Sequence, residues 1–238
     1  MIECEQTSYF SRSMSSSQLT KEIFEWDIHN WSKSVRVWDP VLKSIQGGQA
    51  AAFGERAGGL SLYLAKHGFE VNCSDYDGFN DTPLALHKKH EVEGRISYSA
   101  QDITQIDFPD NHFDVVMFKS VIGALNDKGR QQQAIDELYR ILKPGGYLLF
   151  AENLEATSIH RWARNKFTSW GHRWRYLKWK ERHEMFGKFA SSKFKTRGFL
   201  ATFGRTEGQR NFLAIWDTLN HWWIPKKGKY ILMGACRK

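Results

Sequence analysis

The chain has 238 residues, of which 41% are hydrophobic and 25% are charged. This composition is typical of one globular domain with insertions and argues against a disordered or fibrous chain. No apolar run approaches the roughly 20 residues of a membrane-spanning helix. The three cysteines are far apart and form no C-x-x-C pair, so neither a disulfide framework nor a metal site is indicated. We therefore expect a reduced, cytoplasmic protein.

The net charge of +8 is concentrated in one segment. Residues 156–182 contain eight Lys or Arg and one acid, a net +7, together with four of the ten Trp. The rest of the chain is nearly neutral, so we expect any attraction to an anionic partner to be local.

The N-terminal part is predicted to be helical after a loose tail of about eighteen residues. From Thr20 to Ile45 the apolar residues recur mostly at spacings of three and four, which predicts one or two amphipathic helices, broken near Pro40. Residues 1–46 thus form a tail and helices placed to act as a lid, and residues 47–238 form the main domain.

From residue 47 short apolar runs alternate with helical patterns, which favours a parallel sheet flanked by helices. We expect two terminal apolar runs, Phe199–Phe203 and Tyr230–Ala235, to form an antiparallel pair at the sheet edge. The predicted helices are Leu60–His67, Pro83–Lys89 and Gln131–Leu142. The predicted strands are Ala50–Phe53, Glu70–Ser74, Ile96–Ala100, Val115–Phe118 and Tyr147–Ala151.

A glycine-rich turn, Gly54-Glu55-Arg56-Ala57-Gly58-Gly59, follows the first of these strands. Glycines let a ligand approach the main chain, and the helix start offers free N–H groups. No Gly-Lys-Ser/Thr follows, and Arg56 replaces the second glycine of the dinucleotide pattern, so neither a P-loop nor that pattern fits. Asp75 and the pair Asp102-Ile103 follow the next two strands. In this order the acids indicate a nucleoside pocket at the carboxyl edge of the sheet.

This succession, continued by Phe113–Phe118 and Leu142-Lys143-Pro144-Gly145-Gly146, resembles the class I S-adenosylmethionine-dependent methyltransferases. The resemblance implies a Rossmann-like, doubly wound α/β fold with a seven-stranded sheet whose last strand is reversed. It also implies that S-adenosylmethionine is the cofactor and S-adenosylhomocysteine the product. Gly54 and Gly58 would border the methionine part, Asp75 the ribose, and Asp102 with Ile103 the adenine.

Two positions depart from the family pattern. Ala52 stands where an acid usually contacts the amino group of the cofactor, and Arg56 replaces the middle glycine. Glu55 is a candidate substitute for the missing acid, and Arg56 a candidate partner of the cofactor carboxylate. The same departures would occur in a binding protein that kept the fold and lost the cofactor.

The family's acceptor lies over the ends of the fourth and fifth strands, here Phe118-Lys119-Ser120 and Ala151-Glu152-Asn153. We predict Lys119, Glu152 and His160 near the acceptor, with His160 as a base for a hydroxyl proton. Lys119 also counts among the cofactor-site candidates, and a structural pairing of Lys119 with Glu152 is the alternative. The Asn/Asp-Pro-Pro-Tyr motif of nucleobase amine methylation is absent, which disfavours amine methylation of DNA and leaves RNA open as an acceptor.

The basic segment forms a Trp-rich helical insertion at about 154–198. Its apolar residues Ile159, Ala163, Phe167, Trp170, Trp174 and Leu177 recur at helical spacing, interrupted near Gly171. Three interpretations remain open for this helix. In the first, the helix packs its aromatic side chains on the sheet and exposes its charges to solvent. In the second, residues 156–182 contact anionic lipid. In the third, the helix lines a groove for a phosphate-rich acceptor or RNA.

The sequence therefore predicts a methyltransferase acting on an anionic or lipid-linked small molecule. Stretches such as Gly58-Gly59-Leu60-Ser61 are similar to methyltransferases of bacterial surface-polysaccharide gene clusters, so a sugar hydroxyl is the expected acceptor. The place of action is expected to be the cytoplasm or the inner face of the membrane. RNA methylation and a non-catalytic binding role are the alternatives.

Overall fold

The computed structural model describes residues 18–79, 81–168 and 173–238; most of the predicted tail lies outside them. The α-helices are α2 (Gln18–Phe24), α3 (Ile28–Trp31), α4 (Val35–Ile45), α5 (Gly59–Lys66), α6 (Asp81–Lys89), α7 (Lys128–Ile141), α8 (Ser158–Phe167), α9 (Arg182–Met185) and α10 (Glu207–Leu219). The strands are β1 (Gly48–Phe53), β2 (Phe69–Asp75), β3 (Ile96–Ala100), β4 (Phe113–Lys119), β5 (Leu142–Asn153), β6 (Ser191–Arg197) and β7 (Ile231–Arg237).

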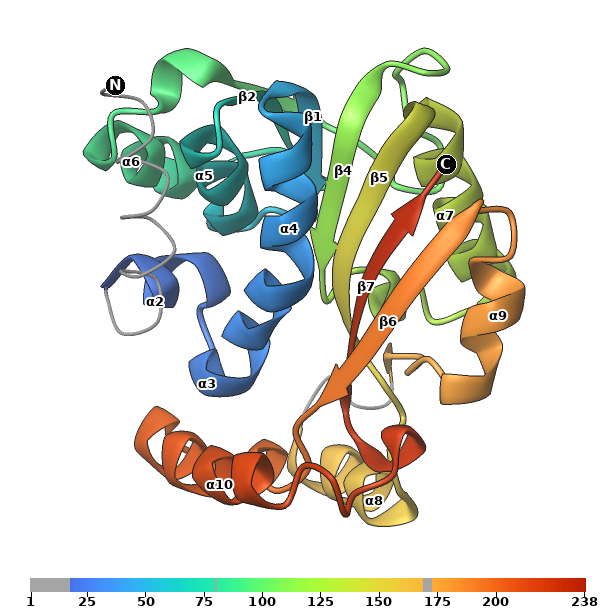
Figure 1. Cartoon of the computed structure of the whole chain (residues 1–238). Helices are drawn as coiled ribbons and strands as arrows, with labels where there is room; N and C mark the ends of the chain where they lie inside the picture. The colour runs from blue at the N-terminus through green and yellow to red at the C-terminus, as the bar shows by residue number, and fades with distance from the viewer. Residues whose placement is uncertain (1–17, 80, 169–172) are drawn as a thin grey trace.

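The seven strands form one sheet in the order β3-β2-β1-β4-β5-β7-β6 (Figure 1). Strands β1 to β5 pair in parallel, whereas β7 runs antiparallel to both β5 and β6. The predicted doubly wound sheet with a reversed last strand is confirmed. The central strands are mostly buried because helices cover both faces, as β4 shows with six buried residues out of seven, five of them apolar.

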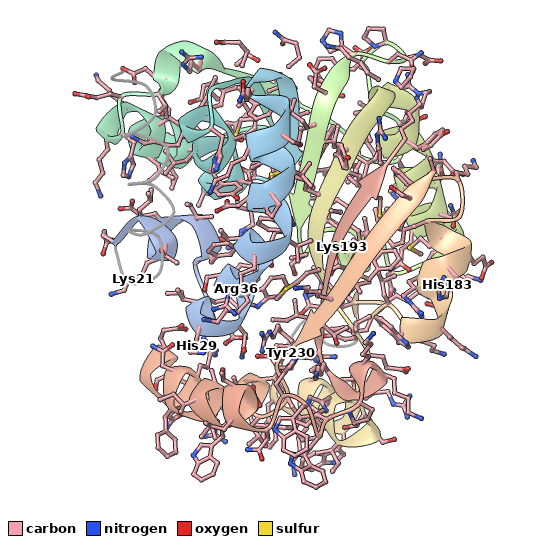
Figure 2. All side chains as sticks on the ribbon, viewed as in Figure 1. Lys21, His29, Arg36, His183, Lys193 and Tyr230 are labelled. Atoms are coloured by element: carbon pink, nitrogen blue, oxygen red, sulfur yellow. The ribbon has the colours of Figure 1, made fainter. Side chains whose placement is uncertain are left out.

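The edge strand lies elsewhere than predicted. Residues 199–203 form no strand, and Ala201–Phe203 is a short 3-10 helix, η6. The partner of β7 is instead the polar strand β6, which falls inside the predicted insertion. Its exposed Lys193 and Lys195 keep this open edge soluble (Figure 2). An edge strand with one solvated face has no apolar run, so a search for apolar runs missed it.

The N-terminal helices also break at a different place. Pro40 lies inside α4, which continues to Ile45. Burial of Val37, Trp38 and Leu42 against the sheet stabilises this helix despite the proline. The chain instead turns between α2 and α3, where Glu25 and Asp27 have φ values of 64° and 42°.

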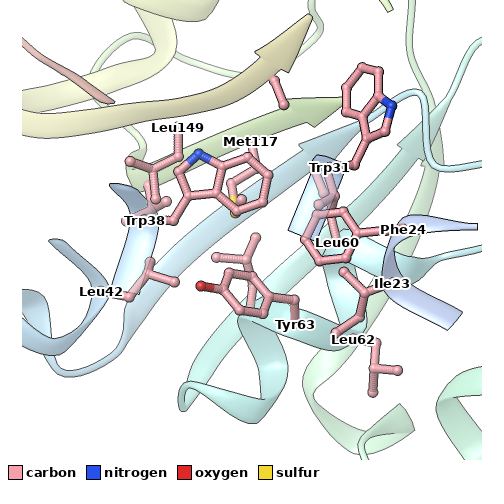
Figure 3. Close-up of a cluster of buried hydrophobic side chains, with 14 of the residues drawn as sticks. Ile23, Phe24, Trp31, Trp38, Leu42, Leu60, Leu62, Tyr63, Met117 and Leu149 are labelled. Carbon is pink, nitrogen blue, oxygen red and sulfur yellow. The ribbon is translucent and has the colours of Figure 1, made fainter. Parts of the chain in front are cut away.

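The helices α2 to α4 belong to the core. Ile23 and Phe24 of α2 and Trp38 of α4 pack with Tyr63 of α5 and Met117 of β4 in one buried cluster (Figure 3). The rings of Phe24 and Trp38 are stacked with their centroids 6.1 Å apart. The centroids of the Trp38 and Tyr63 rings are 6.0 Å apart. These helices therefore cover one face of the sheet as fixed parts of the domain.

The basic segment departs most from its predicted form. Helix α8 ends at Phe167, Trp174 and Leu177 lie outside any helix, and Trp170 falls outside the described residues. The aromatic side chains on α8 are exposed, and two polar ones are buried: His160 at 0% and Arg164 at 7% exposure. The interpretation that the segment packs its aromatics and solvates its charges is therefore wrong for α8. Across the described ranges, no helix is long and apolar enough to cross a bilayer.

Candidate active site

A cavity of about 460 Å³ opens where β1, β2 and β4 end and the chain turns into the following loops. Five predicted cofactor residues line it: Gly54, Arg56, Asp75, Asp102 and Ile103. Because the carboxyl ends of parallel strands meet at one edge, residues that are far apart in sequence converge here.

Asp75 gives this cavity an unsatisfied acceptor. Its carboxylate accepts backbone N–H bonds from Tyr76 and Asp77, and burial raises its pKa. Its Oδ2 atom is nevertheless buried without a hydrogen-bond partner among the described residues. A buried acceptor that lacks a donor is unfavourable unless a ligand supplies one. Two ribose hydroxyls are such donors, so the cavity fits the nucleoside part of S-adenosylmethionine.

The glycine turn is shaped by Gly54, whose φ of +70° is unfavourable for other residues. A Cβ atom on Gly54 would lie 2.3 Å from Cγ2 of Val121, which also lines the cavity. Glycine at this position therefore keeps the turn close to the opposite wall.

Three further cofactor-site candidates lie outside the cavity lining. Glu55 accepts N–H bonds from Leu60 at 3.3 Å and Ser61 at 2.7 Å at the start of α5, and burial raises its pKa to about 7. The carbonyl oxygen of Gly58 accepts a bond from His87 Nε2 at 2.8 Å. Glu55 and Gly58 thus stabilise the turn through these hydrogen bonds without lining the cavity.

Lys119, the third of these candidates, is buried beneath the N-terminal helices. Its ammonium donates to the carbonyl oxygen of Phe24 at 2.8 Å and to Glu25 at 3.1 Å, and lies 4.0 Å from the ring centroid of Trp26. Burial lowers its pKa. Its salt-bridge partner is therefore Glu25, and the alternative pairing with Glu152 is wrong.

Glu152 holds the loop that follows β4. Its Oε2 accepts N–H bonds from Val121 at 2.8 Å and Ile122 at 3.0 Å, and its Oε1 accepts one from Asn153 at 2.7 Å. Burial raises its pKa to about 7. Glu152 lines neither cavity, so its visible role is to position Val121 at the wall of the smaller one.

A second cavity, of about 800 Å³, lies between the N-terminal helices, α8 and the segment that leads into α10. Four cations line it, Arg164, Lys166, Arg205 and Arg210, whereas Asp27 is the one acid among its described lining residues. Aromatic side chains complete the wall, including Trp26, Trp31, Phe167, Phe203 and Tyr230. This cavity favours an anionic ligand with an apolar part.

Asp27 is the main titratable group in this cavity. Its carboxylate accepts a bond from the Tyr230 hydroxyl and one from Asn30 Nδ2 at 3.2 Å. Burial raises its pKa to about 7, and the nearby Glu207 and Asp217 add to this effect. A carboxyl with a pKa near neutrality is suited to accept and release a proton.

His160 also lines the larger cavity, as expected of a residue near the acceptor, but both ring nitrogens are engaged. Nε2 lies 2.8 Å from the carbonyl oxygen of Phe199 and must donate to it. Nδ1 lies 2.6 Å from Thr157 Oγ1 and accepts its hydroxyl proton when the ring is neutral. Burial lowers the pKa of His160, which favours that neutral form.

The two cavities meet at one hydrogen bond. Ser120 lines the smaller cavity and Asn153 the larger one, and Asn153 Nδ2 donates to Ser120 Oγ at 2.7 Å. Ser120 adopts a φ of 56°, which is uncommon for a residue with a side chain. Such strain is often found at functional sites, and here it directs the hydroxyl to the boundary between the cavities.

Residues 52–150 match the model of a family described as "Methyltransferase domain". This range is less than half of the chain, and it contains strands β2 to β4 and most residues of the smaller cavity. Residues 52–150 thus form a methyltransferase domain. This match agrees with the predicted methyltransferase family.

The curated relatives that this methyltransferase domain resembles are ubiquinone/menaquinone biosynthesis C-methyltransferases. The protein of Psychromonas ingrahamii is 38% identical over 61 residues, which cover 26% of this chain and 23% of that protein. That of Proteus mirabilis is 29% identical over 107 residues, which cover 43% and 40%. The chain thus matches between a quarter and two fifths of the length of these relatives.

Solved structures with the same fold cover more of the chain. The N-methyltransferase NodS of Bradyrhizobium japonicum, in complex with S-adenosylhomocysteine, has a TM-score of 0.59 at 15% identity and covers 98% of each chain. Phosphoethanolamine N-methyltransferase 2 of Haemonchus contortus has a TM-score of 0.58 at 17% identity, covering 87% of this chain and 52% of that one. At these identities the likeness establishes the fold.

The larger cavity of the protein contains residues that the sequence did not single out. Asp27, Tyr230 and Arg205 come from three distant segments, so no local motif could identify them. The sequence identified Asn153 and Ser120 only as residues at the ends of predicted strands, and it gave them no role in the site. The smaller cavity differs because each of its acids lies at or just after the end of a strand: Asp75 ends β2, and Asp102 lies two residues after β3.

Proposed function

We propose that this protein transfers a methyl group from S-adenosylmethionine to a hydroxyl oxygen of an anionic or lipid-linked small molecule. A sugar in surface-polysaccharide biosynthesis is an acceptor of this kind. The observation that supports the proposal most directly is the pair of adjoining cavities. One has an unsatisfied carboxylate for a nucleoside, and the other has four cations.

The cofactor would be held at the smaller cavity. Asp75 would accept the two ribose hydroxyls, and Asp102 with Ile103 would border the adenine. Arg56, which also lines this cavity, would contact the cofactor carboxylate. When bound, S-adenosylmethionine supplies a methyl group that its sulfonium makes reactive. The protein's part is to align the acceptor and to exclude water.

The acceptor would be held at the larger cavity. Arg164 is 7% exposed and is fixed by a bond from Nη1 to the carbonyl oxygen of Leu154 at 2.8 Å, with its guanidinium 4.0 Å from the Tyr176 ring centroid. Lys166 and Arg205 lie on exposed positions near the rim. A buried, fixed cation with exposed cations around it suits a phosphate or carboxylate.

A hydroxyl acceptor must lose a proton, and two groups in the larger cavity are candidates to take it. We assign this role to Asp27, because a carboxylate that accepts two hydrogen bonds still has free lone pairs. His160 has no free lone pair in its neutral form, since Thr157 donates to Nδ1. In this proposal His160 orients Phe199 and the wall of the cavity.

The test is a methyl-transfer assay with S-adenosylmethionine labelled in the methyl group. The acceptors are sugar nucleotides, polyprenyl-pyrophosphate-linked sugars, a quinol precursor and RNA, and mass spectrometry with NMR locates the methyl group. We expect an O-methylated, anionic or lipid-linked product. Carbon methylation of the quinol, as the names of the curated relatives would suggest, or methylated RNA would contradict the acceptor assignment.

The alternatives are a non-catalytic binding role and a different reaction on the same fold. The [4+2]-cyclase SpnF has this fold, with a TM-score of 0.58 at 17% identity. Binding of the cofactor without transfer to any acceptor class in the panel would favour such a role.

A further inference from the structure

Exposed apolar side chains are concentrated at one end of the molecule. Of the twelve large hydrophobic residues that are exposed in the described ranges, ten lie between Ile159 and Trp223. They belong to α8, η6, α10 and the turn after α10, which together form what we call the aromatic face. Figure 1 shows α8 and α10 beyond the end of the sheet toward which β4 and β6 point.

Helix α10 presents its most apolar stripe to solvent. Phe212, Ile215, Trp216 and Leu219 follow the spacing of one helix face and are 49% to 62% exposed. The opposite side carries Asp217, which is 5% exposed and accepts N–H bonds from Phe199, Leu200 and Ala201 at 2.6 to 3.1 Å. These three bonds fix the helix with its polar residue inward.

Helix α8 has the same arrangement. Ile159, Trp162 and Phe167 are 64%, 57% and 58% exposed, while His160 and Arg164 face the protein. The turn after α10 adds Trp222 and Trp223, which are 74% and 71% exposed. Their ring centroids are 4.5 Å apart. Figure 2 shows rings at this end projecting away from the sheet. A contiguous apolar surface of this kind marks an interaction site.

The charges around the aromatic face are positive. Exposed cations include Lys166 on α8, Arg205 before α10, and Lys226 and Lys227 after it. Arg161 on α8 is also exposed but pairs with Glu155 at 2.8 Å. Helix α8 contains no acid, and both acids of α10 are engaged: Asp217 is buried, and Glu207 accepts the N–H groups of Asp27 and Ile28. The polar part of this surface therefore complements an anionic partner.

We propose that the aromatic face binds the surface of an anionic lipid bilayer. Trp and Phe side chains would enter the boundary between headgroups and acyl chains, while the surrounding Lys and Arg meet lipid phosphates. The location differs from the predicted contact through 156–182, because α10 and the Trp222–Trp223 turn supply much of the surface.

Two other occupants fit these residues less well. In a symmetric dimer the same face would meet itself and bring cations against cations. Single-stranded RNA stacks its bases on aromatic rings, but the aliphatic Ile159, Ile215 and Leu219 offer no such surface. Hydrocarbon accommodates both kinds of side chain.

The larger cavity opens onto the aromatic face. Phe167, Phe203, Lys166 and Arg205 belong to its lining as well as to the face and its margin, and the Arg205 guanidinium lies 5.7 Å from the Phe167 ring centroid. If the proposed function is correct, an acceptor could keep its apolar chain in the bilayer while its anionic part enters the cavity. The lipid contact itself does not depend on that function.

The experiment is flotation of the full chain with vesicles of phosphatidylcholine alone or of equal parts phosphatidylcholine and phosphatidylglycerol, without cofactor or acceptor. We expect the protein to float with the anionic vesicles. Trp222→Ser/Trp223→Ser should weaken this partition at least about tenfold. Lys226→Glu/Lys227→Glu should weaken it at least about 25-fold at low salt.

Two control variants carry changes of the same kind outside the aromatic face. Leu84→Ser removes an exposed apolar residue of α6, and Lys193→Glu/Lys195→Glu reverses two exposed charges on β6. Both should float like the unchanged protein. Titration with S-adenosylhomocysteine checks that every variant keeps its fold, which separates loss of the lipid contact from failure of the proposed function.

Three results would overturn the proposal. The unchanged protein could remain unbound with both vesicle types, or the face variants and their controls could float alike. Alternatively, the Trp222→Ser/Trp223→Ser change could abolish a vesicle-independent dimer or an RNA complex while vesicle binding is absent throughout. That last result would assign the face to a second copy or to RNA.

Discussion

The two cavities of this protein are built in different ways. The smaller one is formed by turns that directly follow β1 to β4, and its shape depends on backbone conformation, as at Gly54 and Ser120. The larger one is formed by side chains from four distant segments, and a buried network of Asp27, Asn30, Asp217 and Tyr230 links two of them. Substitutions should therefore separate the functions of the two cavities.

The largest effect is expected at Asp27. Asp27→Asn removes the proposed proton acceptor, so turnover of a hydroxyl acceptor should fall by about 10²- to 10⁴-fold. Affinity for S-adenosylhomocysteine should not change, because Asp27 lines only the larger cavity. Steady-state rates with calorimetry measure both quantities. Full turnover in this variant would return the role to His160, and His160→Ala tests it in the same assay.

Asp75 should control the cofactor alone. Asp75→Ala removes the acceptor for the ribose hydroxyls and should weaken cofactor binding by about 1–3 kcal/mol, or roughly 5- to 150-fold. The neighbouring Asp77→Ala is the control, since that side chain is exposed. Calorimetric titration gives the two affinities. Equal losses in both variants would show that general charge near the turn, and not a ribose contact, governs affinity.

The buried carboxyls should make stability fall as pH rises. The pKa of Asp27, Glu55 and Glu152 is raised to about 7 in the folded protein, against about 4 in the unfolded chain. The stability that each protonated group contributes is full below pH 4 and is lost as pH rises through 7. Asp27→Asn cannot ionise, so it should lose less stability than the unchanged protein between pH 5 and pH 8. Chemical denaturation at both pH values measures this, and equal losses would show that Asp27 is already ionised at pH 5.

The smallest effect is expected away from both cavities. Lys128 and Glu184 form a pair at 2.8 Å with side chains 47% and 66% exposed. Solvent screens such a pair, so Lys128→Ala should change stability by less than about 1 kcal/mol. Cofactor affinity and turnover should be unaffected. A change in either would reveal a coupling that the geometry does not show.

The sequence predicted the sheet and the smaller cavity because both follow from local patterns. Apolar runs marked the five parallel strands, and an acid directly after a strand marked Asp75 and Asp102. It did not predict β6, because an exposed edge strand is polar, nor the inward orientation of α8. That orientation is set by distant partners of His160 and Arg164, namely Phe199 and Leu154.

Asp27 escaped prediction for a similar reason. Its raised pKa arises only when α3, α10 and β7 come together around it. In the sequence it is one acid among 26. A motif search finds groups held by a turn, whereas groups held by packing become visible only in the structure.

The most direct test of this account is calorimetric titration of S-adenosylhomocysteine and S-adenosylmethionine into the unchanged protein, Asp75→Ala and Asp27→Asn. For each compound, we predict that Asp27→Asn binds with the same affinity as the unchanged protein. Asp75→Ala should bind each compound at least about fivefold more weakly. Absence of binding by the folded, unchanged protein would contradict the account. It would make Ala52 and Arg56 marks of a lost cofactor site.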